Sequence, residues 1–316
     1  YQGVWSLSEQ YQNASGWPGQ VPPLALFGGA SGPTSSSIDV LDLSSSGNAT
    51  DYGDLSAARF GIGNCSSLTT CFFGGGYETD EVSTIETALF ASTGSVVSFG
   101  DLTIAVRELT GCSSSTRGVF AGGTTGSQSN TIAYVTMASA GNASDFGDLT
   151  VSNGGGGMSG VSSSTRGVFA NGTNNGSTAR NNIEYITIAS AGNSTDFGDQ
   201  VNNTFSSASG ASPVTGLIAG GYDGSANVNV IQSITIASTG NAADFGDLTA
   251  ARRSVKGAAS TTTCVFAGGI TTVITNVIDF VTIASAGNAA DFGDLVPATA
   301  YYTGSGTNTN AHGGLS

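Results

Sequence analysis

The chain has 316 residues, of which 48 are glycine and only 9% are charged. It contains a single lysine, Lys256, and its short runs of Val, Ile, Thr and aromatic residues are separated by Gly and Asn, so we predict an all-β protein. The formal net charge of −14, with no basic stripe, argues against nucleic acid as a partner. The sequence lacks a run of about 20 apolar residues, so we expect no membrane insertion.

Residues 1–23 lie outside the pattern that fills the rest of the chain. They contain both tryptophans, Trp5 and Trp17, followed by three prolines. One interpretation is a segment that folds back and buries its aromatic rings. The other, which we adopt, is a docking or linker segment that contacts an upstream domain or a neighbouring subunit.

A repeat begins at residue 24. A closing phrase, Phe-Gly-Asp-Leu or a close variant, recurs at intervals of 47, 47, 51, 48 and 47 residues. Its copies are Tyr52–Leu55, Phe99–Leu102, Phe146–Leu149, Phe197–Gln200, Phe245–Leu248 and Phe292–Leu295. An aromatic-x-Gly-Gly phrase and an alternating Ile-rich phrase recur in phase with it. Self-similarity of this kind is typical of repeat architectures.

Each unit predicts four short strands. A small, polar first strand precedes an arginine-glycine turn and a second strand that ends in Gly-Gly, where the backbone needs positive φ or close approach. The third strand alternates apolar and polar residues, and the fourth carries the closing phrase after a turn with Gly and Asn. A unit of about 45–50 residues with four strands has the size of a propeller blade.

The number of units predicts a six-bladed β-propeller over residues 24–316. We expect the blades at about 304–316 with 24–55, then 56–102, 103–149, 150–200, 201–248 and 249–295. The first unit lacks a first strand, and the residues after Leu295 have the character of one. The C-terminal strand is therefore expected to join the N-terminal blade and close the ring.

The motifs resemble kelch repeats. The Gly-Gly pair, the aromatic of the closing phrase and an arginine soon after it (Arg59, Arg107 and Arg252) carry the resemblance, although Phe replaces the Trp usual in kelch repeats. The amino-acid sequence of the units resembles that of kelch-like propellers in structural proteins of tailed phages, notably marine and cyanobacterial ones. The resemblance implies a propeller fold and a virion or extracellular location.

The closing phrases, together with the Asp that directly precedes five of them, hold 11 of the 22 acidic residues. Repetition in every blade argues against catalysis, so we expect these carboxylates to be structural, by accepting backbone N–H bonds or by pairing with the arginine of the next blade. Calcium binding is the alternative, although it needs six to eight oxygen ligands. The aromatic rings are expected to pack between blades. The residues concerned are Asp51, Asp54, Asp101, Asp145, Asp148, Asp196, Asp199, Asp244, Asp247, Asp291 and Asp294, with Phe99, Phe146, Phe197, Phe245 and Phe292.

Two kinds of covalent modification are candidates. Cys65 and Cys71 flank a predicted tight turn, so they form either a disulfide across a hairpin or, alternatively, two small buried side chains. Asn48, Asn142 and Asn193 form N-glycosylation sequons within the repeated turn, which is expected to be exposed.

No catalytic constellation is evident. The single histidine, His312, has no assignable partner, which removes the usual residue of general-base and zinc chemistry. We therefore predict a protein that is not an enzyme and that needs no cofactor. The weakest alternative is a secreted carbohydrate-active enzyme that would use Glu78, Asp80 and Glu81.

The segments between second and third strands vary most from unit to unit: Tyr77–Ser83, Thr124–Asn130, Thr173–Asn182 and Tyr222–Asn229. Variable loops on a rigid scaffold are where binding specificity usually lies. The leading hypothesis is a propeller of a virion or extracellular appendage, such as a tail fibre or capsid decoration, that attaches to a surface glycan or protein. The alternative is a self-assembling filament subunit, in which residues 1–23 dock on the next propeller. The expected partners are other appendage proteins or further copies of the chain.

Overall fold

The protein is described here from a computed structural model. The structure describes residues 22–94, 96–152, 157–170, 172–174, 178–296 and 301–307. Trp5, Trp17 and His312 lie outside the described residues, as does nearly all of the proposed docking segment. None of the described residues forms a helix that could cross a lipid bilayer.

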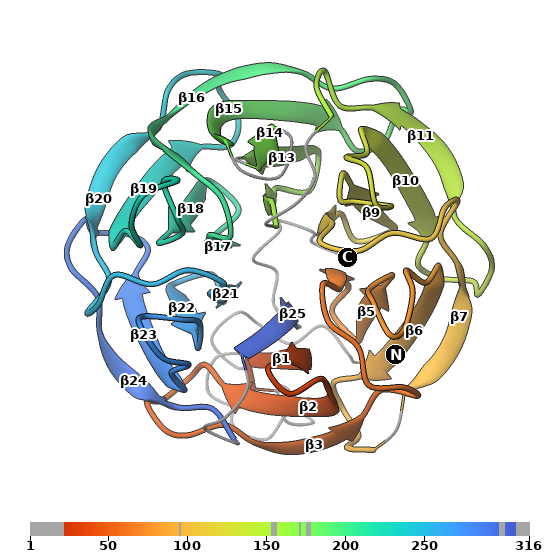
Figure 1. The fold of residues 1–316 in the computed structure, drawn as a ribbon, viewed down its shortest axis with the longest axis horizontal. Coiled ribbons are helices and arrows are strands. Elements are labelled where there is room, and N and C mark those ends of the chain that lie inside the picture. The colour runs from red at the N-terminus through yellow and green to blue at the C-terminus, as the bar shows by residue number, and fades with distance from the viewer. Residues whose placement is uncertain are drawn as a thin grey trace, which may run out of the picture.

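Six antiparallel sheets surround a central axis, as Figure 1 shows. From the axis outward, blade 1 contains β25 (Tyr301–Thr307), β1 (Leu24–Ser31), β2 (Ser35–Asp42) and β3 (Thr50–Asp54). Blade 2 contains β4 (Gly63–Ser66), β5 (Thr70–Gly74), β6 (Thr84–Leu89) and β7 (Val97–Asp101). Blade 3 contains β8 (Thr110–Ser113), β9 (Arg117–Ala121), β10 (Thr131–Thr136) and β11 (Ser144–Asp148).

The remaining blades follow in the same direction around the ring. Blade 4 contains β12 (Ser159–Ser162), β13 (Arg166–Ala170), β15 (Thr178–Thr187) and β16 (Thr195–Thr204), with β14 (Thr173–Asn174) paired to β15. Blade 5 contains β17 (Ala208–Ala211), β18 (Thr215–Ala219), β19 (Val230–Thr235) and β20 (Ala243–Asp247). Blade 6 contains β21 (Lys256–Ala259), β22 (Thr263–Ala267), β23 (Val277–Thr282) and β24 (Ala290–Asp294). The predicted six-bladed propeller with four-stranded blades is confirmed.

The ring closes as predicted, because β25 pairs with β1 and supplies the innermost strand of blade 1. The strand begins at Tyr301, slightly earlier than expected, and residues 308–316 lie outside the described part of the chain. The first and last segments of the propeller are thus held in one sheet, which leaves blade 1 with four strands like the others.

The hydrophobic cores lie between blades. Each of the six apolar clusters takes its residues from two adjacent blades, including one that joins blade 6 to blade 1. The Phe of the closing phrase contributes to these clusters: Phe146 and Phe197 are each 2% exposed, whereas Phe99 is only partly buried. The prediction that these rings pack between blades is confirmed.

A β-bulge directs the Phe of the closing phrase into the core. In blade 3, Ile132 pairs with Gly147 and Ala133 pairs with Asp145, so Phe146 is an extra residue on β11. The register of the third and fourth strands shifts at the corresponding place in all six blades. Because a bulge changes the direction of a side chain, Phe146 enters the core while its neighbours Asp145 and Asp148 stay exposed.

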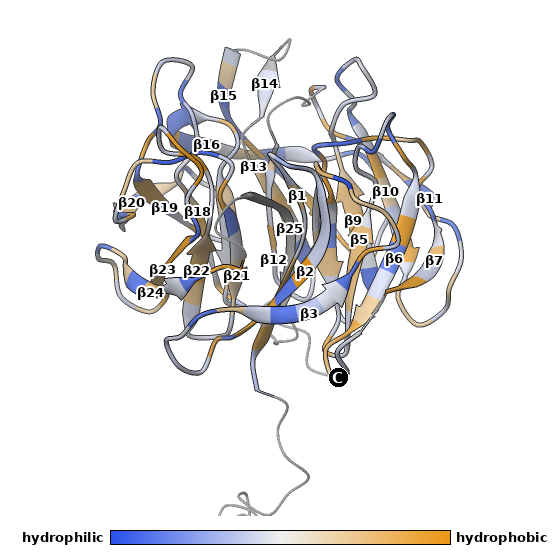
Figure 2. Ribbon diagram, turned by 60° about the horizontal axis from the view of Figure 1, so that its bottom comes forward, coloured by the Kyte–Doolittle hydropathy of each residue, from blue (hydrophilic) through white to orange (hydrophobic). Residues whose placement is uncertain are grey.

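The strand order gives the disc two different faces. One face, which we name the loop face, carries the connections between second and third strands and the crossovers from one blade to the next. The other, the turn face, carries the tight turns between first and second strands and between third and fourth strands. Figure 2 shows β14 and the start of β15 standing out from the loop face at blade 4.

Candidate functional site

The closing phrase forms the joint between one blade and the next. In the joint between blades 3 and 4, the N–H of Gly192 donates to the carbonyl of Phe146 at 2.6 Å. The backbone N–H of Ser194 donates to the backbone carbonyl of Asp148 at 2.9 Å. The side-chain oxygen of Asn193 accepts the N–H of Asp148 at 3.0 Å. Each turn between third and fourth strands therefore extends the outer strand of the preceding blade.

The same joint recurs around the ring. The pair of backbone bonds is present at all six boundaries, and the Asn side chain adds its bond at five of them. At the closing boundary, Gly47 and Ala49 of blade 1 bond to Phe292 and Asp294 of blade 6 at 2.9 Å each. The repeat period thus reflects a joint between units as much as a fold within each unit.

The glycine of the closing phrase is required by this joint. Gly147 has φ +143°, and a Cβ at this position would lie 2.5 Å from the carbonyl carbon of Gly192. Real Cβ atoms do not approach backbone so closely, so a side chain here would separate the two blades. At Gly192, by contrast, an added Cβ would have no other atom within 4 Å.

The acidic residues of the closing phrase do not play the role predicted for them. The backbone N–H of Asp101 and Asp148 completes the joint, whereas the carboxylates of Asp54 and Asp101 accept hydroxyl bonds from Ser36 and Ser83. Their pairing with the arginine of the next blade was a wrong prediction, because Arg59, Arg107 and Arg252 form their ion pairs with other carboxylates. Among the described residues, no three acidic, His or Cys side chains gather as a metal site.

The three candidate glycosylation residues are exposed, as predicted for the repeated turn. Asn48, Asn142 and Asn193 each accept a backbone N–H bond from the preceding blade through the amide oxygen. They are therefore structural residues of the joints, a role that the sequence alone did not suggest. Their glycosylation stays a prediction.

A second set of contacts between blades lies deeper and was missed in the sequence. It is built on the third strand, at the residue after the buried Ile. Asp39, Glu86, Glu184, Gln232 and Asp279 occupy this position, and all five are at most 2% exposed. Each accepts a backbone N–H of the preceding blade at 2.6–3.2 Å, from the crossover in four cases and from β16 in the case of Gln232. The bond from Val296 to Asp39 spans the closing boundary.

Two buried arginines pair with these carboxylates. Arg59 lies 2.7 Å from Glu86, and Arg252 lies 3.1 Å from Asp279. Burial lowers the pKa of both guanidinium groups, whereas the facing carboxylates raise it. The ion pairs compensate for the desolvation of charges that are almost fully buried.

We expected Arg107 at the position equivalent to Arg59 and Arg252, and this prediction was wrong by one residue. Arg107 forms a β-bridge with Thr124, as Phe60 does with Tyr77 and Arg253 does with Ile270. The position equivalent to Arg59 in blade 3 is therefore Val106, and the carboxylate position there is Ala133. Both are buried. Arginine and carboxylate are thus absent together at this boundary.

Of the two alternatives for Cys65 and Cys71, the structure shows the buried side chains and not the disulfide, and all four cysteines are free and buried. Cys65 pairs with Phe72, and Ser66 pairs with Cys71, so Cys65 and Cys71 project from opposite faces of the hairpin. They belong to the cores on either side of blade 2. Burial raises the pKa of each thiol, which opposes formation of the reactive thiolate.

The three acidic residues of the enzyme hypothesis lie on the loop face of blade 2. Glu81 is 3.3 Å from Arg107, and Glu78 is 3.9 Å from the buried Arg59. Asp80 is exposed. Two of the three carboxylates thus face arginines, an arrangement that neutralises their charge and fixes the loop, and it is not the pairing of carboxylates that glycoside hydrolysis requires.

The loops on this face have fixed bases. At blade 2, Phe60 packs 5.3 Å from Tyr77, and Arg107 lies over the same ring at 4.7 Å. Blade 5 repeats the arrangement with Phe205, Tyr222 and Arg253. Because both tyrosine rings already have partners, they anchor the loops and do not offer a free stacking surface.

The loop tips differ in chemistry from blade to blade. The tip of blade 2 is acidic, and that of blade 3 is polar, with Thr125 and Ser127. Blade 5 presents Asp223, whose pKa is lowered by hydrogen bonds from Ala226 and Ser225. Blade 6 presents Val273, which is 68% exposed. In blade 4 the expected loop over Thr173–Asn182 is largely a hairpin of β14 and β15.

A cavity lies on the axis of the ring, between the first strands. Its volume is about 70 Å³, which is room for several water molecules or one small ion. Lining residues come from β4, β8, β12, β17 and β21. Around it, serine hydroxyls join neighbouring first strands: Ser113 donates to Ser66 at 2.8 Å, and Ser162 donates to Ser113 at 2.9 Å. This explains why the first strand of each unit is small and polar.

Comparisons with known proteins found no match, so the functional interpretation depends on the geometry described above. No model of a protein family matches the chain, and no curated protein matches its sequence. The propeller architecture is therefore shown by the structure, and the kelch-like and phage resemblances stay predictions from the motifs.

Proposed function

We propose that the chain is a non-enzymatic propeller of a virion or extracellular appendage, of the tail-fibre or capsid-decoration type, and that its loop face attaches to a surface glycan or protein. The observation that carries this proposal is the contrast within the loop face. The loop bases are fixed by ring contacts and bridges, whereas the tips differ in charge and polarity from blade to blade.

The rest of the ring has the properties of a scaffold. The backbone joints recur at every boundary, and the cores are continuous around the ring. A rigid support with varied tips is the usual arrangement of a binding surface. The resemblance of the motifs to kelch-like propellers of tailed phages supports the location that we propose.

The location is tested by immunogold electron microscopy of native source material with an antibody raised against the full chain. Label on tailed particles or cell appendages is the expected result. Label along continuous filaments, without particles, would replace the proposal with the self-assembling filament.

Attachment is tested with the full chain on an array of bacterial surface polysaccharides. In one variant, residues 79–80 and 223–226 are replaced by Gly-Ser segments of equal length; the control replaces the exposed residues 138–140 on the turn face, which leaves Gly141 of the joint in place. The tip variant should lose binding at least tenfold, and the control should retain it. Equal binding by the two variants would contradict a role for the loop face.

A further inference from the structure

Lys256 breaks the symmetry of the axial cavity. It is the first residue of β21 and pairs with Ala267, as Thr110 pairs with Ala121 and Ala208 pairs with Ala219. The equivalent residues in blades 2–5 are Gly63, Thr110, Ser159 and Ala208. Four small residues thus stand where blade 6 has the only lysine of the chain. A long cationic side chain fits there because its counterparts leave space.

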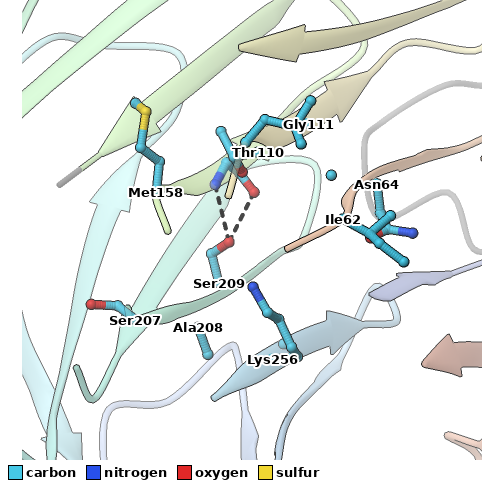
Figure 3. Close-up of a pocket in the computed structure, with 13 residues that line it drawn as sticks. Ile62, Asn64, Thr110, Gly111, Met158, Ser207, Ala208, Ser209 and Lys256 are labelled. Atoms are coloured by element: carbon cyan, nitrogen blue, oxygen red, sulfur yellow. Dashed lines mark hydrogen bonds between the residues drawn. The ribbon is translucent and has the colours of Figure 1, made fainter. Parts of the chain in front are cut away.

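The amino group of Lys256 extends into the cavity. Figure 3 shows it pointing away from its own strand, into the space that Thr110 and Ser209 also line. The described residues give this ammonium group no hydrogen bond and no ion pair. Lys256 as a whole is half-buried.

The cavity offers a second donor beside the ammonium group. The hydroxyl of Thr110 has no hydrogen-bond partner among the described residues, whereas Ser209 is already bonded to both backbone groups of Gly160. Thr110 and Lys256 line the same cavity from β8 and β21. An ammonium group and a hydroxyl are the donors that an oxyanion accepts, and charge-assisted bonds of this kind are short and strong.

Two opposing influences act on the charge of Lys256, the one cation that lines the cavity among the described residues. Burial lowers the pKa of Lys256 to about 8, against the field of Glu108, which raises it. Glu108 lies on the crossover into blade 3 and donates its backbone N–H to Gly61 at 2.6 Å. Among the described residues, Glu108 is the charged side chain whose field acts on Lys256. A bound anion would compensate for the desolvation of the cation.

We propose that the axial cavity is a binding site for a small oxyanion, such as sulfate, phosphate or a short carboxylate, and that Lys256 and Thr110 hold it. The site is distinct from the loop tips and does not depend on the function proposed for them. The lysine makes the inner strand of blade 6 chemically different from the inner strands of blades 2–5, although the joints between blades repeat around the ring.

The single lysine provides a direct measurement on the full chain. Protein labelled with ¹³C at the lysine ε-carbon gives one ε-carbon signal, which reports the protonation of Lys256. Sulfate, phosphate and acetate are titrated separately at constant ionic strength, with chloride as the balancing salt. We expect a saturable shift and a pKa that is higher in the oxyanion than in chloride. A signal that responds to the oxyanions no differently than to chloride would overturn the proposal.

The pH dependence has a defined sign. Lys256 binds the anion in its charged form, so affinity should be greatest below pH 8 and fall about tenfold for each pH unit above it. A response to sulfate and phosphate alone identifies a tetrahedral ligand, and a response to acetate as well identifies a carboxylate.

Variants test the residue independently by thermal unfolding in each salt. Lys256→Thr installs the residue of the equivalent position in blade 3 and should abolish the increase in Tm that the oxyanion produces. Arg180→Gln removes the same charge from the hairpin of blade 4 and should retain that increase. Equal increases in Lys256→Thr and the unchanged chain would show that the anion binds elsewhere.

Discussion

The boundary between blades 1 and 2 and the boundary between blades 2 and 3 solve one packing problem with opposite chemistry. The first contains the ion pair of Arg59 and Glu86, and the second contains Val106 and Ala133 at the equivalent positions. Both sets are buried in their cores. The comparison shows that each boundary needs two residues that match each other, either two charges of opposite sign or two apolar side chains. This agrees with the small net contribution of buried ion pairs to the free energy of unfolding.

The largest expected effect comes from breaking the ion pair on one side. Glu86→Ala leaves the guanidinium of Arg59 buried without its close partner and with only Glu78, 3.9 Å away, which should cost about 3–5 kcal/mol of unfolding free energy. Denaturant unfolding measures the loss. The double variant Arg59→Val with Glu86→Ala copies the boundary between blades 2 and 3 and should recover most of the loss. A double variant as unstable as the single one would show that the two boundaries are not interchangeable.

The next effect tests the joint that both boundaries share. Gly147→Ala places a Cβ against the backbone of Gly192 at φ +143° and should cost about 2–3 kcal/mol, measured by thermal and denaturant unfolding. Gly192→Ala changes the other side of the same joint, where a Cβ meets nothing, and serves as the control. Similar losses from the two substitutions would refute the close approach of the backbones.

A smaller effect isolates the side-chain bond of the joint. Asn193→Ala removes the acceptor for the N–H of Asp148 but leaves both backbone bonds, so we expect a loss of about 1 kcal/mol. Asn203→Ala, an exposed position on β16, is the control. The joint would be assigned to the backbone alone if both variants unfold at the denaturant concentration of the unchanged chain.

The smallest effect concerns the carboxylates of the closing phrase. Asp145→Asn removes an exposed charge from the outer strand of blade 3, and unfolding should change by less than about 0.5 kcal/mol. Calcium added to the unchanged chain should leave Tm where it is. An increase in Tm with calcium that Asp145→Asn abolishes would restore the calcium hypothesis.

The sequence was sufficient for the unit, the number of blades and the closing strand, because these depend on period and strand pattern. It was not sufficient for contacts between units. The phrase around Phe146 reads as the end of one blade, yet its glycine is explained only by Gly192 of the next. The register of the hairpin decides that Cys65 and Cys71 face different cores, and the sequence does not specify that register.

Some errors had a signal that could have prevented them. Arg107 follows Asp101 by six residues, whereas Arg59 follows Asp54 by five, so equal counting would have placed Val106 at the position of Arg59. The polar residue after the Ile of the third strand, such as Glu86 or Asp279, interrupts an apolar run and is a candidate buried partner. The role of Lys256 depends on small residues from four other strands, which converge only in the ring.

The joint also bears on how such a chain could arise. Each unit carries both halves of it, an accepting strand at one side and a donating turn at the other, as in the pair formed by Phe146 and Gly192. This is a head-to-tail interface, and such interfaces produce closed rings when the rotation between copies divides a full turn. Duplication of one ancestral unit would therefore supply complementary neighbours at once, and later divergence could proceed blade by blade at positions outside the joint.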